Sequence, residues 1–421
     1  MMKKKSRKTR KEEALFEKGN LQKLRIALFT HDTFGLGHVK RCLHITRALA
    51  KRLPNSSILL ITGCPALDAL KDLPPNADCV KIPTVVKTGA RDCRPPHLSL
   101  SVVETTLLRS RIIKETVLAF APDVFVVDNF PLGSQGELLG LLQALKDSAT
   151  RTVLGLRDVL DAGEVVQADW KRQGVYEVLE RYYDRILVYG LREIFDAARE
   201  YGLKRLVARK IRYCGYLTDT RPVKSTARRL RSQLGVNGAF VLATGGGGGD
   251  AYPLLSRFVR AADMLDGISS VVFTGPLMGQ SDREKLRGQL RKGSPVILRD
   301  FVPDLRPYLK AADVVVTMCG YNMAAEILAY RPRAIVVPRT WRYGEHSRWN
   351  RTRPEKEQII RAEVLAKFGL VTLIEPEELS AEHLAEKICE LLSSRRRRST
   401  KKLNVGGVER AAEEIIAAAV S

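Results

Sequence analysis

One stretch of the chain combines a strand, a tight turn and a helix start: Asp313-Val314-Val315-Val316-Thr317-Met318-Cys319-Gly320-Tyr321-Asn322-Met323-Ala324-Ala325-Glu326. Its first residues are typical of a buried parallel strand, and residues 323–329 favour a helix. Backbone N–H groups at a helix start are unpaired and lie at the positive end of the helix dipole, so the turn at Gly320 can hold a phosphate. Glu326 follows about one and a half turns into the helix, within reach of a ribose on that phosphate. The alternative is a glycine needed only for the turn and an exposed glutamate, because a single glycine turn is a weak motif.

Length and composition limit the class of protein. A chain of 421 residues with 45% hydrophobic residues is long enough for two globular domains with separate cores. No apolar run approaches the ~20 residues of a membrane span, and no signal-peptide core follows the basic N-terminus, which predicts a cytoplasmic protein. The seven cysteines form no C-x-x-C pair, so we expect reduced thiols.

The net charge of +23 is large for this length. Part of it lies in two clusters, residues 3–11 and residues 395–402. Such clusters can bind nucleic acid, anionic lipid headgroups or acidic substrates, or they can be solvated ends that keep the protein soluble. Residues 1–22 lack apolar periodicity and are predicted to form a mobile basic tail.

Residues 23–218 are predicted to form one α/β domain. Apolar runs alternate with helical stretches, which is the pattern of a doubly wound, Rossmann-like domain. The first run, residues 24–30, leads into the glycine loop of residues 31–38 and then into a helix from about residue 39 to residue 53. Further strands are predicted at residues 57–62, 123–128, 151–156, 185–190 and 211–215.

Residues 219–395 repeat the alternation after a polar, basic linker with a short helix. Strands are predicted at residues 239–244, 270–274, 296–298, 314–316 and 334–338. The first of these runs into five consecutive glycines, residues 245–249, which let the backbone approach a ligand closely. Residues 396–421 hold part of the basic run and an amphipathic helix that we expect to dock on the body, bridging the halves. The two α/β halves are predicted to face a shared cleft.

The order of these motifs resembles that of a known family. Two such halves, the Leu36-Gly37-His38 loop, the glycines 245–249 and the 319–326 segment occur together in GT-B glycosyltransferases. The chain looks most like the branch that contains the UDP-N-acetylglucosamine transferase of peptidoglycan synthesis (the MurG-like branch), and within it the uncharacterised glycosyltransferases. This resemblance covers roughly residues 24–392. It implies a GT-B fold, a hexosyltransferase activity and a UDP-sugar that is a substrate, with no separate cofactor.

The resemblance also implies a donor site in the C-terminal half. The base would be held by backbone groups of residues 300–303, and the diphosphate by the helix start at residues 320–322. Glu326 matches an acid that binds ribose, and Gln358 matches a residue that contacts the sugar hydroxyls. The predicted donor-binding residues are Gly245, Gly246, Gly247, Phe301, Val302, Gly320, Tyr321, Asn322, Glu326 and Gln358.

The acceptor is expected on the N-terminal half, with Gly35 and Gly37 at the mouth of the cleft. His38 follows the glycine loop at the carboxyl end of a strand, where α/β folds bind ligands, and the ordinary pKa of histidine suits a base or a phosphate contact. The alternative for His38 is a packing or N-capping histidine. Asp128 ends another strand and is predicted to be a second base or an acceptor ligand, or to open an Asx turn.

Metal-independent transfer is predicted, because the chain has no Asp-x-Asp and no His, Cys or Asp cluster with metal-ligand spacing. Helix dipoles and basic side chains would then stabilise the departing diphosphate. The sequence also departs from the peptidoglycan enzyme. Residues 31–35 are not a pure glycine-threonine run, and Tyr321-Asn322 replaces small residues, so the sugar and the acceptor do not follow from the resemblance.

The predicted function is glycosyl transfer from a UDP-sugar or related nucleotide sugar to a glycan or lipid-linked acceptor. An anionic membrane surface is a further predicted partner, with the protein in the cytoplasm or at the inner face of the membrane. A nucleotide-sugar hydrolase or epimerase on the same fold is the alternative among enzymes. A non-catalytic nucleic-acid-binding protein is the alternative of another class, but 6% aromatic residues and cations clustered at the ends make nucleic acid a poor candidate.

Overall fold

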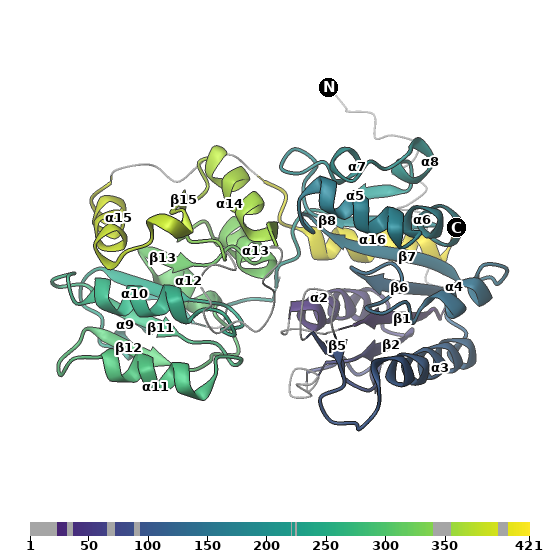
Figure 1. The fold of residues 1–421 in the computed structure, drawn as a ribbon, viewed down its shortest axis with the longest axis horizontal. Helices are drawn as coiled ribbons and strands as arrows, with labels where there is room; N and C mark the ends of the chain where they lie inside the picture. The colour runs from purple at the N-terminus through teal and green to yellow at the C-terminus, as the bar shows by residue number, and fades with distance from the viewer. Residues whose placement is uncertain are drawn as a thin grey trace.

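Two parallel β-sheets, one in each half of the chain, organise the protein (Figure 1). The computed structural model describes residues 23–31, 37–64, 72–87, 93–219, 221–223, 225–339, 355–394 and 403–421. The predicted tail of residues 1–22, the loop residue Gly35 and the basic run of residues 395–402 lie outside the described residues. The fold class is α/β with two doubly wound domains, as predicted.

The first sheet has seven strands in the order β3-β2-β1-β6-β7-β8-β9, and all neighbours pair in parallel. Its central strands are buried on both faces, which explains their continuous apolar sequences. The strands are β1 (Arg25–Thr30), β2 (Ser57–Thr62), β3 (Ala77–Lys81), β6 (Val124–Asp128), β7 (Arg151–Arg157), β8 (Arg185–Tyr189) and β9 (Ile211–Tyr213). A two-stranded hairpin of β4 (Val86–Lys87) and β5 (Cys93–Arg94) lies apart from the sheet.

Helices cover both faces of this sheet (Figure 1). The longest, α3, begins with a capping box in which Ser101 and Glu104 bond each other's backbone N–H groups. The helices are α2 (Gly37–Arg52), α3 (Val102–Phe120), α4 (Leu139–Leu145), α5 (Gly163–Arg172), α6 (Val175–Tyr182), α7 (Ala197–Glu200) and α8 (Arg205–Ala208).

The second sheet has six strands in the order β12-β11-β10-β13-β14-β15, which is the strand order of dinucleotide-binding domains. The strands are β10 (Phe240–Thr244), β11 (Ser269–Phe273), β12 (Val296–Arg299), β13 (Val314–Thr317), β14 (Arg333–Val336) and β15 (Thr372–Leu373). The helices are α9 (Ala227–Gln233), α10 (Tyr252–Ala262), α11 (Gln280–Gln289), α12 (Arg306–Ala311), α13 (Tyr321–Tyr330), α14 (Glu357–Lys367) and α15 (Ala381–Ser393), with the 3₁₀ helix η3 (Pro376–Glu378).

The last helix, α16 (Gly407–Ala419), returns to the N-terminal domain (Figure 1). It packs against α2 and against β6, β7 and β8. Arg52 of α2 donates to Glu409 and Glu413, and Arg185 donates to Glu414. After the second domain the chain therefore returns to the first. The helix α16 is part of the N-terminal domain and not a separate C-terminal unit.

The domains share one apolar core at their junction. The buried cluster that contains Val39 and Leu43 of α2 continues through Tyr321 and Met323 of α13 to Val408 of α16. Burial of this surface stabilises the arrangement in which the two sheets lie side by side (Figure 1).

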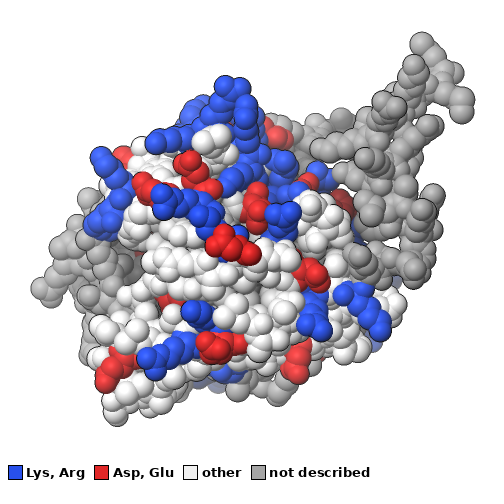
Figure 2. Space-filling model, turned by 90° about the vertical axis from the view of Figure 1, so that its right-hand side faces the viewer, with Lys and Arg blue, Asp and Glu red and all other residues white. Residues whose placement is uncertain are grey.

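Charge is spread over the body of the protein as well as its ends. Most of the 70 Lys and Arg residues lie between the two terminal clusters. On the side of the N-terminal domain turned away from the second domain, cations and carboxylates are interspersed around a largely uncharged band (Figure 2). The described residues of this face do not form the continuous basic surface that a nucleic-acid-binding protein presents.

The described part of the chain contains neither a candidate membrane span nor a candidate metal cluster. None of its helices is both long and apolar enough to cross a membrane. Within the same residues, no group of three or more His, Cys, Asp or Glu side chains is arranged to hold a metal ion.

Candidate active site at the junction of the two domains

The strand order of each sheet reverses beside residues that the sequence predicted to be functional. The reversal falls between β1 and β6 in the first sheet and between β10 and β13 in the second. Open α/β sheets bind ligands at this point, outside the carboxyl ends of the strands. His38 follows β1 and Asp128 ends β6, whereas Gly245 follows β10 and Gly320 follows β13. Residues of both predicted half-sites therefore flank the reversal points.

His38 and Asp128 form a hydrogen-bonded pair. Nδ1 of His38 lies 2.5 Å from Oδ2 of Asp128, and Arg41 donates to the same oxygen at 2.9 Å. With Nδ1–H donating to the carboxylate, Nε2 of His38 is the nitrogen that can accept a proton. The sequence left Asp128 as a second base, an acceptor ligand or an Asx residue. The structure places it behind His38 as the partner of the imidazole.

The charges around the pair favour a neutral imidazole beside an ionised carboxylate. Burial and Arg41 lower the pKa of His38, and Asp128 offsets only part of this effect. Burial alone would raise the pKa of Asp128, but Arg41 and His38 bring it below its ordinary value. At neutral pH the pair is thus in the state that a general base requires.

Polar atoms without partners gather beside this pair. Nδ1 of His31, Nε of Arg41 and Oδ1 of Asp128 are buried and have no hydrogen-bond partner among the described residues. The His31 ring lies 4.1 Å from the His38 ring and 4.4 Å from the ring of Phe130, which is 43% exposed. Unpaired buried polar atoms are rare in folded proteins, and a catalytic role is one of the explanations for them.

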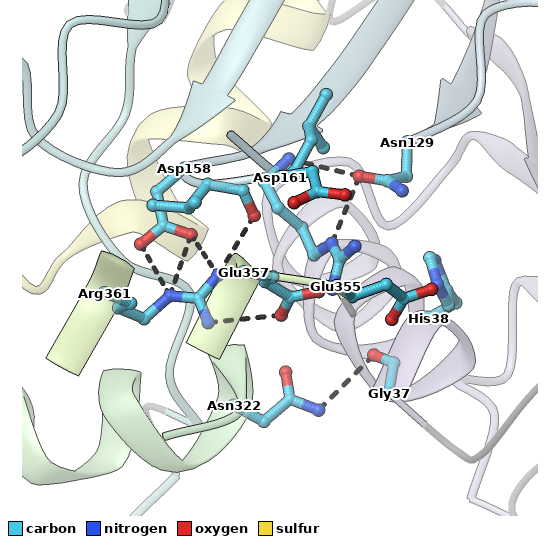
Figure 3. A network of polar contacts seen from close by, with 12 residues as sticks. Gly37, His38, Asn129, Asp158, Asp161, Asn322, Glu355, Glu357 and Arg361 are labelled. Carbon is cyan, nitrogen blue, oxygen red and sulfur yellow. Dashed lines mark hydrogen bonds and ion pairs between the residues drawn. The ribbon is translucent and has the colours of Figure 1, made fainter. Parts of the chain in front are cut away.

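The predicted acceptor and donor loops touch at the junction (Figure 3). Nδ2 of Asn322, in the first turn of α13, lies 3.5 Å from the carbonyl oxygen of Gly37, to which it donates. A Cβ at Gly37 would lie 3.3 Å from that nitrogen, so the Asn322 side chain would have to shift by a few tenths of an ångström to accept one. His38, the next residue, is therefore held close to the helix start that was predicted to bind phosphate.

The start of α13 is open. No side chain of the described residues caps it, so backbone N–H groups of its first turn can bind an anion. Gly320 has φ −63° and ψ 151°, which any residue can adopt, and a Cβ there would lie 4.0 Å from Nε2 of Gln358. Neither strain nor crowding explains the glycine, and its lack of a side chain leaves space above the turn. Gln358 is held beside the turn because its Oε1 accepts from the N–H of Arg339.

Tyr321 contributes its side chain to the junction and only its backbone to the open turn. Its ring is 3% exposed, and its hydroxyl accepts a hydrogen bond from the N–H of Leu217. The guanidinium carbons of Arg41 and Arg361 lie 5.2 Å and 5.9 Å from the ring centre. The tyrosine that replaces a small residue of the resembled enzymes thus packs against two buried arginines.

The glycines after β10 have different structural reasons. A Cβ at Gly245 would clash with Ala251, and Gly246 has φ +67°. Gly247 has neither constraint, since its nearest neighbour would be a flexible Leu277 methyl at 3.6 Å. Gly246 and Gly247 are exposed, so their backbone is accessible to a ligand.

The remaining donor-side residues lie near a cation from the other domain. Lys40 of α2 places its Nζ 5.8 Å from the ring centre of Phe301, which is 46% exposed, while Val302 packs against the core. Burial raises the pKa of Glu326 to about 7, and Lys40 acts in the opposite direction. Glu326 is half-buried and is not the exposed helix glutamate of the alternative interpretation.

A buried ion network joins the domains behind these loops (Figure 3). Arg361 of α14 is fully buried and donates to Asp158, which follows β7, at 2.8 Å and 3.0 Å. It also donates to Glu357 and to the carbonyl of Cys319, the residue before the open turn. Arg157 bonds Glu357 from the other domain, and with Arg361 it lowers the pKa of Glu357 to about 2, although burial alone would raise it.

Several residues of this junction were not predicted from the sequence. They are Arg41, Lys40, His31, Arg157, Asp158, Glu357 and Arg361. Proximity to a motif could have suggested Lys40 and Arg41, which follow His38 in the chain. His31, which opens the predicted glycine loop, and Glu357, which precedes Gln358, could have been suggested in the same way. Arg157, Asp158 and Arg361 carry no local signal, because a buried charged residue cannot be distinguished from an exposed one without its partner.

Two Rossmann-like domains whose ligand-binding edges meet at a shared junction define the GT-B class of fold. Solved structures have the same fold. The glycosyltransferase of kitacinnamycin superposes with a TM-score of 0.63 at 16% identity, covering 94% of this chain and 99% of the other. MurG from Acinetobacter baumannii superposes with a TM-score of 0.58 at 13% identity, covering 93% and 99%.

Sequence comparisons narrow the class. Residues 241–415 match the glycosyltransferase family 28 C-terminal domain. A curated relative from Anaeromyxobacter sp. (strain Fw109-5) is the UDP-N-acetylglucosamine--N-acetylmuramyl-(pentapeptide) pyrophosphoryl-undecaprenol N-acetylglucosamine transferase, 28% identical over 173 residues. The match covers 40% of this chain and 42% of the relative, so it spans less than half of either protein. The predicted resemblance to GT-B glycosyltransferases of the MurG-like branch is confirmed.

Proposed function

We propose that the protein is a glycosyltransferase that moves a sugar from a UDP-sugar to an acceptor hydroxyl. One observation carries the proposal: the His38–Asp128 pair of one domain lies beside the open, uncapped start of α13 in the other, with Asn322 bonded to Gly37 between them. A base and an anion site at one junction are what this transfer requires.

The reaction uses the two half-sites together. Nε2 of His38 takes the proton of the acceptor hydroxyl while that oxygen forms a bond to the anomeric carbon of the donor. The bond between this carbon and the diphosphate oxygen breaks, and the nucleoside diphosphate leaves with the electron pair. The N–H groups at the start of α13 stabilise the charge on the leaving group, and Asp128 stabilises the imidazolium of His38.

The donor is assigned to the C-terminal domain. The ribose hydroxyls would donate to Glu326, the base would lie against residues 300–303 near Phe301, and the sugar would extend toward Gln358. The exposed glycines after β10 offer further backbone contacts. Lys40 adds a cation from the N-terminal domain, so the nucleotide would be held by both domains.

A lipid-linked acceptor is supported by an apolar surface at one end of α3. Because α3 leads into β6, its N-terminal half lies toward the carboxyl edge of the sheet, on the side of His38. Val103 is 68% and Leu107 56% exposed, although both are apolar. The exposed apolar residues here are Leu98, Leu100, Val103, Leu107 and Leu108, with the exposed cations Arg94 and Arg111. Such a surface is suited to contact an anionic membrane, in which a lipid-linked acceptor would be anchored.

Nucleotide binding tests the donor half of the proposal. Titration of UDP by calorimetry, with a chelator present, should give the same affinity as without it, because helix dipole and side chains take the place of a metal. In Glu326→Gln we expect about tenfold weaker binding, since a carboxylate accepts the ribose hydroxyls through charge-assisted bonds worth roughly 1.5–3 kcal/mol. With Glu326 titrating at about pH 7, the affinity of the parent should rise between pH 6 and pH 8.

The Glu326→Gln variant is also the control for the pH dependence of UDP binding. Glu326→Gln should lose the pH dependence between pH 6 and pH 8, because Gln does not ionise, while its thermal stability stays close to that of the parent. Binding that disappears with chelator would refute the metal-free donor site. Equal affinity in parent and variant would remove Glu326 from it.

Vesicle binding tests the apolar surface of α3. A Val103→Glu/Leu107→Glu variant should bind vesicles of phosphatidylcholine and phosphatidylglycerol about tenfold more weakly than the parent, because two apolar contacts are lost and two negative charges are added. Met264→Glu is the matched control: Met264 is 51% exposed but lies in the second domain. Equal binding of the parent and the double variant would contradict the membrane contact.

Product analysis separates the proposal from its alternative on the same fold. A transferase incubated with UDP-sugar should release UDP only when an acceptor hydroxyl is supplied. Rapid release of free sugar without acceptor would indicate a hydrolase, and a changed sugar configuration would indicate an epimerase.

A further inference from the structure

Arg41 occupies the point where the two domains and the His38–Asp128 pair meet. Its side chain is 2% exposed. Nη2 lies 2.9 Å from Oδ2 of Asp128 and 2.8 Å from Nδ1 of His38, and the guanidinium faces the ring of Tyr321 at 5.2 Å. A single side chain of α2 therefore contacts both members of the pair and the first residue of α13.

We propose that Arg41 is a positioning residue that sets the protonation and tautomer of His38 and makes both depend on the docking of α13. The proposal rests on the proposed function in one respect, since it takes His38 to be the base. The effect of the Arg41 guanidinium on the His38 imidazole can be measured whether or not the protein transfers sugar.

The hydrogen-bond partners of Nδ1 of His38 explain why the position of the imidazole proton has to be controlled. Nδ1 faces a group that can only donate, Arg41, and a group that when ionised can only accept, Asp128. A neutral imidazole satisfies one of them. If Nδ1 carries the proton, it donates to Asp128 and Nε2 is basic. If Nδ1 is bare, it accepts from Arg41 and the proton sits on Nε2, which then cannot act as a base.

The contact with α13 favours the first of these states. Tyr321 is held in place, because its hydroxyl accepts a hydrogen bond from Leu217 N and the guanidinium carbon of Arg361 lies 5.9 Å from its ring centre. Its face attracts the guanidinium of Arg41 and so holds it at the Asp128 carboxylate. With Arg41 beside it, Asp128 stays ionised and is the stronger acceptor for Nδ1–H. Separation of α13 from α2 would release Arg41 and free it to donate to Nδ1.

Among the described residues, four titratable groups from the surrounding elements contact the His38 imidazole or act on its charge. They are Asp128 at the end of β6, Arg41 on α2, His31 after β1 and Arg157 at the end of β7. Burial and Arg41 lower the pKa of His38, Arg157 acts in the same direction, and Asp128 opposes them. Burial is the main reason that the pKa of His31 is also lowered, so His31 is neutral. Removal of the Arg41 charge should therefore move the pKa of His38 upward.

The test compares Arg41→Met, which removes the charge, with Arg41→Lys, which keeps it. The readout is nitrogen NMR of ¹⁵N-imidazole-labelled protein, with the His38 signals assigned by their loss in His38→Asn. In Arg41→Met the titration midpoint of His38 should move to higher pH, and Arg41→Lys should restore much of the parent midpoint. Tyr321→Leu keeps the arginine at position 41 but removes the ring that holds it at Asp128. This variant should raise the fraction of His38 that carries its proton on Nε2.

Arg47→Met is the matched control, because Arg47 lies on the same helix but pairs with Asp72 and does not contact His38 or Asp128. It should leave the His38 titration unchanged. Thermal unfolding identifies any variant that does not fold. If Arg41→Met does not fold, Arg41→Lys and Tyr321→Leu carry the test through the tautomer signal.

Turnover then distinguishes this proposal from the function on which it rests. If the parent transfers sugar, kcat/KM of Arg41→Met at pH 6 should fall about tenfold or more, and its acid limb should shift with the NMR midpoint while UDP affinity stays within about threefold. A His38 titration identical in parent and Arg41→Met overturns the role of Arg41, whatever happens to turnover. A shifted titration in a protein that transfers no sugar refutes the proposed function and leaves the role of Arg41 standing.

Discussion

Replacement of His38 by alanine is expected to lower turnover by about a hundredfold or more, because a positioned general base contributes typically 10²–10⁴-fold. His38 is the group at the junction whose Nε2 can accept a proton while Nδ1–H is held by Asp128. The measurement is kcat for transfer from UDP-sugar to an acceptor at saturating donor. UDP affinity should change by less than about threefold, since the donor is assigned to the other domain.

Two comparisons make the His38 result specific. Asp128→Asn keeps the shape of the partner but removes its charge, so it should also lower kcat while the fold persists. His383→Ala places the same change on α15, far from the junction, and should leave kcat unchanged. Near-normal turnover in His38→Ala would show that the histidine only packs between α2 and β6.

Replacement of Arg361 by alanine is expected to lower the free energy of unfolding by about 3–5 kcal/mol, which is typical when one partner of a buried ion pair is removed. Asp158 is 1% exposed and, among the described residues, would keep only the hydroxyl of Tyr216, at 2.8 Å, as a side-chain donor. The variant should also weaken UDP binding, because Arg361 holds the Cys319 carbonyl beneath the open turn. Chemical denaturation followed by circular dichroism measures the first effect and calorimetry the second.

The control for Arg361 is an ion pair that is not buried. Arg52 donates to Glu409 and Glu413, both 40% exposed, and its replacement by alanine should cost no more than about 1 kcal/mol. Equal losses for Arg52→Ala and Arg361→Ala would contradict the role assigned to the buried network. Because buried ion pairs can often be replaced by apolar groups, the triple change Arg361→Met/Asp158→Leu/Tyr216→Phe should recover part of the lost stability.

The local sequence predicted the strands well for a physical reason. A central strand of a parallel sheet is covered on both faces, so its sequence is a short apolar run, and every run singled out on this basis is a strand with ends shifted by at most two residues. The edge strand β3 was missed because most of its residues are only partly buried and its sequence is mixed. The helix α3 was missed because half of its apolar side chains face solvent.

Some features of the candidate site could likewise be predicted from the local sequence, and others could not. The glycine turn before α13 and the position of His38 follow from local order, strand then loop then helix, and could be recognised in the sequence. The pairing of His38 with Asp128 depends on β1 and β6 being neighbours, which follows from the strand order of the whole sheet and not from any local pattern. For this reason the sequence left several roles open for Asp128.

By itself, then, the sequence determined the fold class, with two α/β halves and the glycine loops that follow their strands, because apolar periodicity and glycine turns act over a few residues. The tertiary structure alone decided which charges are buried and with whom. Arg41 and Arg361 are arginines like any other in the sequence, and a buried guanidinium is tolerated only where its partners converge on it. Asp128 meets Arg41 from a strand 87 residues away, and Asp158 meets Arg361 from the other domain, 203 residues away.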